Sequence, residues 1–350
     1  MPPRLRASLP FLQWPRPSGA LLRSEALAGL TVGLMVIPQG VAYAALAGMP
    51  VVTGIYASML PALVAALFSA SPRLSVGPTA LSSLLVAASL TGMAAPGSAE
   101  WVNLAVWLSL LTGLLQIVLG LVRAGWLLNV VTAPVLMAFT QGAAVLIITS
   151  QLPALLGLPK GGGALADWSA PHLASAVFGL VTLVLLVLAK RVKPTFPSVL
   201  VVVLVTAAIS AFTPYAAHGG QVVGPLPQGL PGLFVPHWPG WAALGQLIMP
   251  MLIITLVSFL ETASSAKVDN AGRGTRWNQN QDLIGQGLAK LASGISGAFP
   301  TSSSFSRSAL NLYAGAKTGW ASIFSAVVVG LALLVFTPVL RHVPQAVLAA

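Results

Sequence analysis

A run of hydroxyl side chains and one arginine, residues 300–308, carries the clearest chemistry in the sequence. Its letters are PTSSSFSRS, in which Thr301, Ser302 and Ser303 are candidate N-caps of a helix. The N-terminus of a helix exposes unpaired N–H groups and about half a positive charge, and Arg307 adds a full charge. The run therefore predicts an anion-binding site if it lies at membrane depth. Outside the membrane it would be a hydroxyl-capped loop.

Glu261 is the acidic residue that lies well inside an apolar run, residues 252–266. A carboxyl group at this depth costs about 2.5–3.5 kcal/mol on insertion scales, so it indicates a functional role. Burial favours the neutral form of a carboxyl group, so Glu261 could take up and release a coupling proton. The alternative role is structural, as a partner for Arg307 or for backbone groups.

The composition is that of a polytopic membrane protein. Of the 350 residues, 56% are hydrophobic and 7% are charged, whereas about a quarter of a soluble domain is charged. The net charge of +11 does not indicate a nucleic-acid partner, because the basic residues lie between apolar runs and form no stripe with aromatic residues. The sequence has no cysteine, its histidines lack metal-ligand spacing, and it has no nucleophile–base set. We expect no enzyme, no metal site and no cofactor beyond a coupling cation.

Apolar segments of bilayer length, about 20 residues each, must position these residues. They are predicted at 25–46, 52–69, 78–93, 102–122, 127–151, 172–189, 196–213, 241–266, 283–299, 301–315 and 318–338, and a twelfth begins near Val343. The sequence therefore predicts an all-α polytopic membrane protein.

Basic residues predict the orientation of these segments, because cytoplasmic loops are enriched in lysine and arginine. With the N-terminus inside, Lys160 and Arg341 fall outside the cell and Arg307 falls within a span. The others fall on the cytoplasmic side: Arg4, Arg6, Arg16, Arg23, Arg73, Arg123, Lys190, Arg191, Lys193, Lys267, Arg273, Arg276, Lys290 and Lys317. We expect an inner-membrane protein whose N-terminus is cytoplasmic.

Three segments are short or interrupted. The first contains Pro38 and Gly40 in its middle, where proline removes a backbone hydrogen bond and glycine allows a bend. The third follows the extended stretch Ser75–Thr79, and the tenth is the hydroxyl-rich run itself. About 53 residues separate the start of the first segment from Pro78, and about 58 separate residue 243, in the eighth, from Thr301.

This matched spacing predicts an inverted-repeat transporter. Seven segments precede the eighth, so a second copy would enter the membrane upside down, and the caps at Pro78–Thr79 and Thr301–Ser303 would meet near mid-membrane. We expect a cytoplasmic segment at 1–24, a first repeat at 25–213, an extracytoplasmic linker at 214–240 and an incomplete second repeat at 241–350. At least two further spans are expected to complete the second repeat.

Six short stretches of the sequence share one resemblance. They are AGLTVG from Ala28, IPQGVAYA from Ile37, GIYAS from Gly54, SVGPTA from Ser75, SFLE from Ser258 and SFSRSA from Ser304. Together they resemble the sulfate permease (SulP) family of anion transporters, which includes the animal anion exchangers and the motor protein prestin. The resemblance implies a fold of seven plus seven inverted helices. Segments one to four and eight to eleven would form a core domain, and segments five to seven and twelve to fourteen a gate domain. It also implies a homodimer and a cytoplasmic STAS domain after the last helix, and we expect the sequence to stop before the last two helices and that domain.

The resemblance also implies roles for individual residues. Arg307 matches the family's arginine near the central anion, with a role as counter-ion to Glu261 as the alternative. Gln39 and Tyr43 lie where the family lines its pocket, although Tyr43 could serve packing alone. An acid at Glu261 resembles proton-coupled symporters and also a sodium-coupled bicarbonate branch, in which Ser265 would be the co-ligand. The predicted substrate-binding residues are Gln39, Tyr43, Pro78, Thr79, Ser303, Ser304, Phe305, Ser306 and Arg307.

These observations together predict a secondary transporter for a small inorganic or carboxylic anion, with sulfate and proton symport as the preferred hypothesis. The alternatives are a sodium-coupled bicarbonate carrier or a C4-dicarboxylate carrier of the same fold, and an anion channel, exchanger or motor protein. A nucleobase permease would not need Arg307 at its site. The expected partners are the anion, the lipid bilayer and a second copy of the chain, without nucleic acid.

Overall fold

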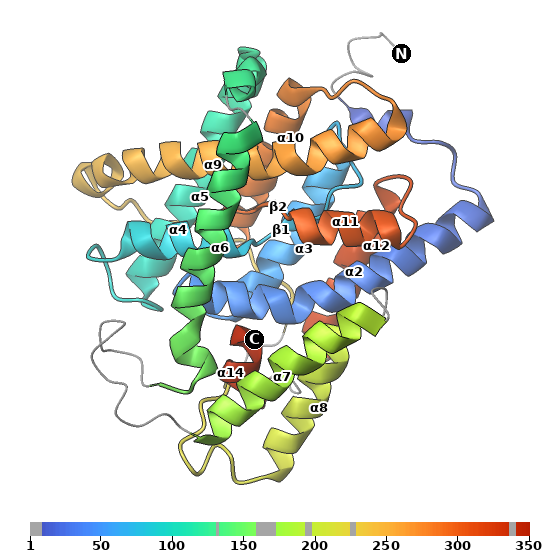
Figure 1. Ribbon diagram of the computed structural model, residues 1–350. Helices are drawn as coiled ribbons and strands as arrows, with labels where there is room; N and C mark the ends of the chain where they lie inside the picture. The colour runs from blue at the N-terminus through green and yellow to red at the C-terminus, as the bar shows by residue number, and fades with distance from the viewer. Residues whose placement is uncertain (1–8, 131–132, 159–172, 193–197, 225–228, 336–340) are drawn as a thin grey trace. The chain divides into compact units, whose positions relative to one another are not determined.

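The computed structural model describes residues 9–130, 133–158, 173–192, 198–224, 229–335 and 341–350 (Figure 1). Arg4, Arg6, Lys160 and Lys193, which the orientation prediction used, lie outside the described residues. The chain forms two compact units, one of Met1–Leu136 with Leu230–Gly330 and one of Met137–Gly229 with Leu331–Ala350. The first unit holds predicted segments one to four, eight to ten and most of eleven, and the second holds most of five, together with six, seven and the start of twelve. This division agrees with the core and gate domains that the resemblance implies.

The first unit is helical except for two short strands. Its elements are η1 (Pro10–Gln13), α2 (Gly19–Leu46), α3 (Val52–Phe68), β1 (Val76–Gly77), α4 (Ala80–Leu90), α5 (Ala99–Leu121), η2 (Ala124–Val130), α9 (Trp241–Arg273), α10 (Gln279–Ile295), β2 (Ser302–Ser303), α11 (Phe305–Tyr313) and most of α12 (Trp320–Val335). Among the described helices, α2, α5 and α9 are long and apolar enough to cross a membrane, and several shorter helices, α3, α4 and α12 among them, are also apolar.

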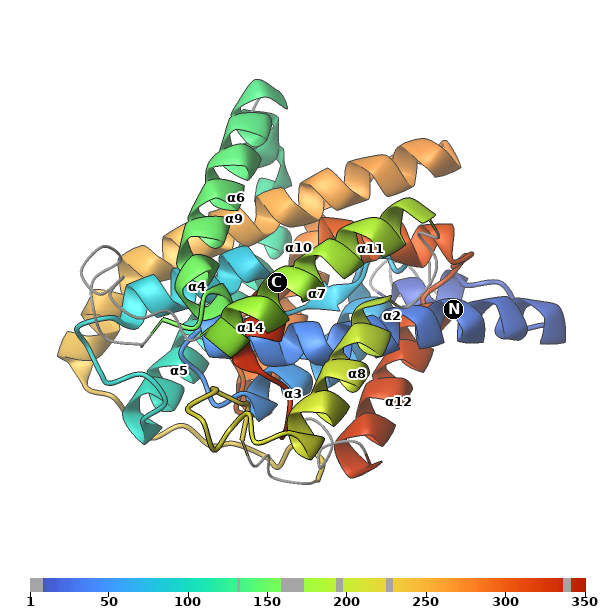
Figure 2. The ribbon, with the colours of Figure 1, turned by 60° about the horizontal axis from the view of Figure 1, so that its bottom comes forward.

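The second unit contains most of α6 (Ala133–Leu155), with α7 (Leu173–Val192), α8 (Ser198–Phe212) and α14 (Gln345–Ala349). Helices α7 and α8 lie side by side, and α14 packs against both of them (Figure 2). Val222 pairs with Pro344 in a short antiparallel bridge. The hydroxyl groups of Ser175 and Tyr215 lie 2.7 Å apart.

Close approach at glycine sets the packing of the first unit. A Cβ atom on Gly113 of α5 would lie 2.7 Å from the carbonyl oxygen of Gly287 on α10, and one on Gly287 would lie 2.6 Å from the Gly113 oxygen. Side chains do not fit between backbones at this separation, so both positions require glycine.

Helix α2 is continuous, so the predicted break at Pro38 and Gly40 is wrong. Pro38 lies inside a helix of 28 residues, where it removes one hydrogen bond without ending the helix. Gly40 serves close packing instead of a bend, because a Cβ atom there would lie 2.7 Å from the carbonyl oxygen of Gly54 on α3.

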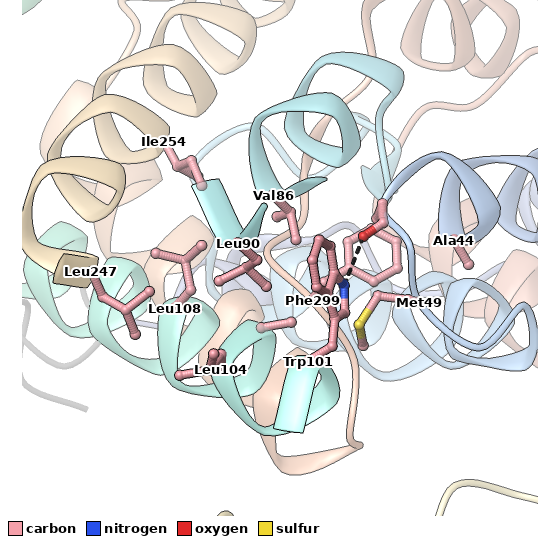
Figure 3. Close-up of a cluster of buried hydrophobic side chains, with 12 residues drawn as sticks. Ala44, Met49, Val86, Leu90, Trp101, Leu104, Leu108, Leu247, Ile254 and Phe299 are labelled. Carbon is pink, nitrogen blue, oxygen red and sulfur yellow. Dashed lines mark hydrogen bonds between the residues drawn. The ribbon is translucent and has the colours of Figure 1, made fainter. Parts of the chain in front are cut away.

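A cluster of buried apolar side chains joins the ends of α2, α4, α5 and α9 (Figure 3). Trp101 of α5 lies within it, and its indole Nε1 donates a 3.0 Å hydrogen bond to the carbonyl oxygen of Ala47. The other members are Ala44, Met49, Val86, Leu90, Leu104, Ala105, Leu108, Leu247, Ile254 and Phe299. This cluster fixes α4 between α2 and α9.

The extended stretches that precede α4 and α11, in the third and tenth predicted segments, meet as a pair of antiparallel strands. Val76 pairs with Ser303 and Gly77 pairs with Ser302, so the prediction that the two caps come together is confirmed. Helix α4 follows β1 and helix α11 follows β2, and the two helices lie on opposite sides of the strand pair (Figure 1). Their N-terminal ends therefore lie next to each other.

The N-cap of α11 differs from the prediction. Ser304 is the N-cap, and its hydroxyl oxygen accepts a 3.4 Å hydrogen bond from the backbone N–H of Arg307. Ser302 and Ser303 were candidates, but their backbones are extended in β2, and Thr301 lies before that strand. Thr79 is the N-cap of α4 and accepts from the backbone N–H of Ser82 at 3.3 Å.

Candidate functional site

The candidate site lies in the first unit, where the N-terminal ends of α4 and α11 meet. Each helix end exposes N–H groups with no partner inside the helix, and the two ends together direct about one positive charge to one place. The capping hydroxyls of Thr79 and Ser304 add polar groups beside these ends. Such a place suits an anion.

Arg307 supplies a full charge at this place. It lies on the first turn of α11 and is only 1% exposed. Its Nε donates to Ser75 Oγ at 3.4 Å, and its Nη1 donates to Gln39 Oε1 at 3.5 Å. Its Nη2 has no hydrogen-bond partner among the described residues. Both contacts are long, so the guanidinium group is incompletely satisfied and can still donate to a ligand.

Gly77 lies beside this guanidinium group. A Cβ atom on Gly77 would lie 3.4 Å from Arg307 Nη2. At this separation a Cβ atom would be in ordinary van der Waals contact with the guanidinium group.

Glu261 lies on α9 and is partly buried. Its Oε2 accepts a 3.2 Å hydrogen bond from Thr79 Oγ1. It interacts electrostatically with both Lys290 and Arg307. Among the described residues, however, Arg307 and Glu261 form no ion pair within 4.0 Å. The Ser302 side chain also forms a hydrogen bond with this carboxyl group. The direct partners of Glu261 are thus the capping threonine of α4 and a serine of β2.

The other predicted substrate-binding residues differ in their burial and in the element on which they lie. Gln39 and Tyr43 lie one turn apart on α2 and are half-buried. Pro78 is buried directly before Thr79, and the Ser304 and Ser306 hydroxyls lie 3.3 Å apart.

Three further predicted residues have contacts or exposure outside this centre. Ser303 Oγ accepts a 3.0 Å hydrogen bond from Gln286 Nε2. Phe305 is 54% exposed. The Ser265 hydroxyl donates to the backbone oxygen of Glu261 at 3.2 Å, not to its carboxyl group.

Lys290, which the orientation prediction counted among the charges of the cytoplasmic side, is a buried residue of the protein interior. It is fully buried on α10, and its Nζ donates a 2.9 Å hydrogen bond to Gln116 Oε1 on α5. The prediction treated it as a loop charge, although it lies inside the predicted apolar segment 283–299. A charge inside an apolar run was the signal that identified Glu261, and it applied equally to Lys290.

A second polar network, which the sequence analysis did not anticipate, holds the chain that leads into β1. Buried Asp269 of α9 forms ion pairs with Arg73 and, at 2.9 Å, with Arg273. Buried Asp282 of α10 accepts from the backbone N–H of Ser71 at 3.0 Å and from its hydroxyl at 2.7 Å. These contacts fix residues 71–73, and therefore the position of β1, against α9 and α10.

Comparison with known proteins assigns this chain to a family. The sequence model described as "Sulfate permease family" matches residues 22–350. "Sulfate transporter 4.1, chloroplastic" of Arabidopsis thaliana is 33% identical over 344 residues, which cover 93% of this chain and 50% of the relative. A probable sulfate transporter of Mycobacterium tuberculosis is 34% identical over 322 residues, which cover 90% of this chain and 57% of the relative. The chain thus spans about half the length of the curated relatives it matches.

Solved structures show the same fold. The murine Solute Carrier 26 family member A9 anion transporter in the inward-facing state matches with a TM-score of 0.89 and 25% identity, over 100% of this chain and 62% of that one. The transmembrane domain of the cyanobacterium bicarbonate transporter BicA matches with a TM-score of 0.82 and 22% identity, over 95% of this chain and 88% of that one. The chain therefore has the all-α membrane transporter fold, as predicted, and multi-pass topology.

Proposed function

Because the chain belongs to the sulfate permease family, a family of transporters and not of enzymes, we propose that it carries a small oxyanion across a membrane and that this anion is sulfate. The observation that carries the proposal is the buried guanidinium group of Arg307, whose Nη2 has no partner among the described residues. The names of the relatives from Arabidopsis thaliana and Mycobacterium tuberculosis support sulfate as the substrate.

The proposed binding mode uses three sources of positive potential. The N-terminal ends of α4 and α11 contribute about half a charge each, and Arg307 contributes one. The oxyanion accepts hydrogen bonds from Arg307, from the exposed N–H groups of the helix ends and from the hydroxyls of Ser304 and Ser306. Because one strand pair holds both helix ends, the first unit moves the anion as one body during alternating access.

We also propose that uptake is coupled to a proton carried by Glu261. The hydrogen bond from Thr79 Oγ1 links this carboxyl group to the first turn of α4 and hence to the anion site. Protonation of Glu261 removes a negative charge near Arg307 and so favours anion binding. Sodium is the alternative coupling ion, with Glu261 and Ser265 as its ligands, because the Ser265 hydroxyl donates its hydrogen to the Glu261 backbone oxygen and keeps its own oxygen able to bind a cation.

The cellular setting belongs to the same proposal. The chain acts as a homodimer in the plasma membrane, which is the inner membrane in cells that have two membranes. Its N-terminus lies in the cytoplasm. The distribution of basic residues outside the apolar segments supports this orientation.

Uptake of labelled sulfate into proteoliposomes tests the proposal. We expect saturable uptake, counterflow, and stimulation by an inward proton gradient but not by an inward sodium gradient. Unlabelled sulfate, bicarbonate, succinate and chloride are the competitors. If another anion inhibits uptake of labelled sulfate more strongly than unlabelled sulfate does, that anion and not sulfate is the preferred substrate. A current that does not saturate and shows no counterflow would indicate a channel.

A further inference from the structure

Lys290 is a buried basic residue for which the proposed mechanism has no role. It lies in the middle of α10, is 0% exposed, and its Nζ donates to Gln116 Oε1 at 2.9 Å. An unpaired charge in such a place is costly, so it requires a compensating group nearby.

The Gln116 amide group is held in one orientation by the backbone of α9. Its Nε2 donates to the carbonyl oxygen of Thr255 at 3.2 Å and to Ser258 Oγ at 2.8 Å. A carbonyl oxygen can only accept, so the amide nitrogen must face α9 and the amide oxygen must face Lys290. The network is therefore arranged to accept from an ammonium group.

Close helix packing brings Lys290 to this place. Gly113 and Gly287, whose backbones are in near contact, lie one turn before Gln116 and Lys290 on α5 and α10 respectively. On the other side of the network, Ser258 lies one turn before Glu261 on α9. The Ser302 hydroxyl of β2 donates to the backbone oxygen of Ser258 at 3.2 Å. Lys290 thus reaches the environment of Glu261 through Gln116 and Ser258.

The basic side chains among the described residues that interact electrostatically with the Glu261 carboxyl group are Lys290 and Arg307. The neutral phenol of Tyr43 also lies within reach of both Glu261 and Arg307. Lys290 has no carboxylate other than Glu261 as such a partner among the described residues. When Glu261 is ionised, the side chains of Glu261, Lys290 and Arg307 together carry a net charge of one positive unit. Without Lys290, Glu261 would cancel Arg307 and the helix ends alone would attract the anion.

We propose that Lys290 is a positioning residue that determines specificity: its ammonium group offsets the Glu261 carboxylate, so that the Arg307 charge remains available to the anion and the site favours a divalent anion. This inference rests on the proposed function. The Coulomb energy is proportional to the ligand charge. A change in the charge of the site therefore alters the logarithm of the affinity about twice as much for a divalent anion as for a monovalent anion.

The experiment measures binding of sodium sulfate and sodium nitrate by calorimetry to wild type and to Lys290→Met, Lys290→Arg and Gln116→Leu. For Lys290→Met we expect affinity to fall about tenfold for nitrate and about a hundredfold for sulfate, if the separation of charge and anion is taken as on the order of 10 Å and the effective dielectric constant as about 20. Lys290→Arg keeps the charge and should retain most of the preference for sulfate. Gln116→Leu removes the acceptor but leaves all three charges, so it should change both affinities by the same factor. Unchanged affinities in folded Lys290→Met, or equal losses for the two anions, would overturn the inference.

Thermal unfolding without anion gives a second readout, which does not depend on the substrate. Lys290→Met should lower the melting temperature more in the wild-type background than in Glu261→Gln, because only the first leaves an uncompensated carboxylate. Equal shifts in the two backgrounds would contradict the pairing. If wild type binds neither sulfate nor nitrate, the proposed substrate is wrong. The comparison of melting temperatures in the two backgrounds still tests whether Lys290 acts on Glu261.

Discussion

Thr79 Oγ1 donates a 3.2 Å hydrogen bond to Glu261 Oε2, while the same oxygen accepts from the backbone N–H of Ser82 at 3.3 Å. One hydroxyl therefore joins the acid on α9 to the first turn of α4. A hydrogen bond to an ionised carboxylate is roughly twice as strong as one to a neutral carboxyl group. Ionisation of Glu261 should thus tighten this contact and protonation should loosen it, at one wall of the candidate anion site.

The first prediction concerns Thr79. Thr79→Val preserves the shape of the side chain but removes the hydroxyl, so it should cost about 0.5–2 kcal/mol of stability from the lost cap and weaken the response of uptake to a pH gradient. Thr79→Ser keeps the hydroxyl and should retain both. Melting temperatures and proteoliposome uptake with and without a pH gradient measure the two effects. A valine variant with normal pH-driven uptake would show that this contact takes no part in coupling.

The second prediction concerns Glu261. Glu261→Gln has the shape of the protonated acid and cannot release a proton, so it should abolish uphill uptake driven by a pH gradient. Exchange of labelled for unlabelled sulfate should continue, because the anion site is intact. Uptake and exchange in the same proteoliposome preparation measure both activities. Accumulation by the variant with normal pH dependence would leave Glu261 with a structural role only.

The sequence predicted that residues 75–79 and residues 301–308 meet, because the signals that mark each of these stretches are local. Proline, glycine and capping residues mark the ends of helices, and matched spacing relates residues 75–79 to residues 301–308. The positions of α4 and α11 follow from these signals with errors of a few residues. Ser304 was missed as the cap because the pairing of β2 with β1 extends the chain across Ser302 and Ser303, and no local pattern encodes a partner more than two hundred residues away.

Local sequence patterns also could not predict the contacts between helices, because these contacts depend on residues that lie far apart in the chain. Pro38 and Gly40 suggest a break when α2 is considered alone, yet Gly40 is explained by the backbone of Gly54 on the neighbouring helix. The environment of Lys290 depends on Gln116, which lies in a separate segment with no sequence relation to it. Charge position along a chain predicts a side of the membrane only where the residue faces water, and Lys290 does not.

The third prediction concerns Glu25, a buried acid that links α2 to the start of α12. Its carboxylate accepts hydrogen bonds of 2.8, 2.9 and 2.8 Å from the backbone N–H groups of Lys317, Thr318 and Ala321. Glu25→Gln loses the charge and one acceptor oxygen, so unfolding should become easier by about 1.5–3 kcal/mol.

Thermal or denaturant unfolding measures the effect of Glu25→Gln. Glu100→Gln is the matched control, because its side chain is 47% exposed and pairs only with His237 among the described residues. The control should be nearly neutral, as exposed pairs usually are. An equal loss in the two variants would mean that the contacts of Glu25 with α12 add no stability.

The last prediction compares the charge of Arg307 with the two helix ends. Each helix terminus is typically worth about 0.3–1 kcal/mol, and up to about 2 in partly buried sites, whereas a hydrogen bond to a charged group is worth about 1.5–3 kcal/mol. Arg307→Ala should therefore weaken sulfate binding about ten- to a hundredfold, at about 1.4 kcal/mol per decade. Arg307→Lys should recover only part of this, because lysine keeps the charge and loses the planar fork.

The competing role for Arg307, as a counter-ion to Glu261, gives a different pattern. In that case Arg307→Ala would fold poorly, and adding Glu261→Gln would restore its melting temperature. The absence of an ion pair within 4.0 Å among the described residues favours the first pattern. Calorimetric titration of sulfate and chloride into wild type, both single variants and the double variant separates the two roles. A well-folded Arg307→Ala protein with undiminished sulfate affinity would exclude Arg307 from the anion site, because the helix ends alone would then account for binding.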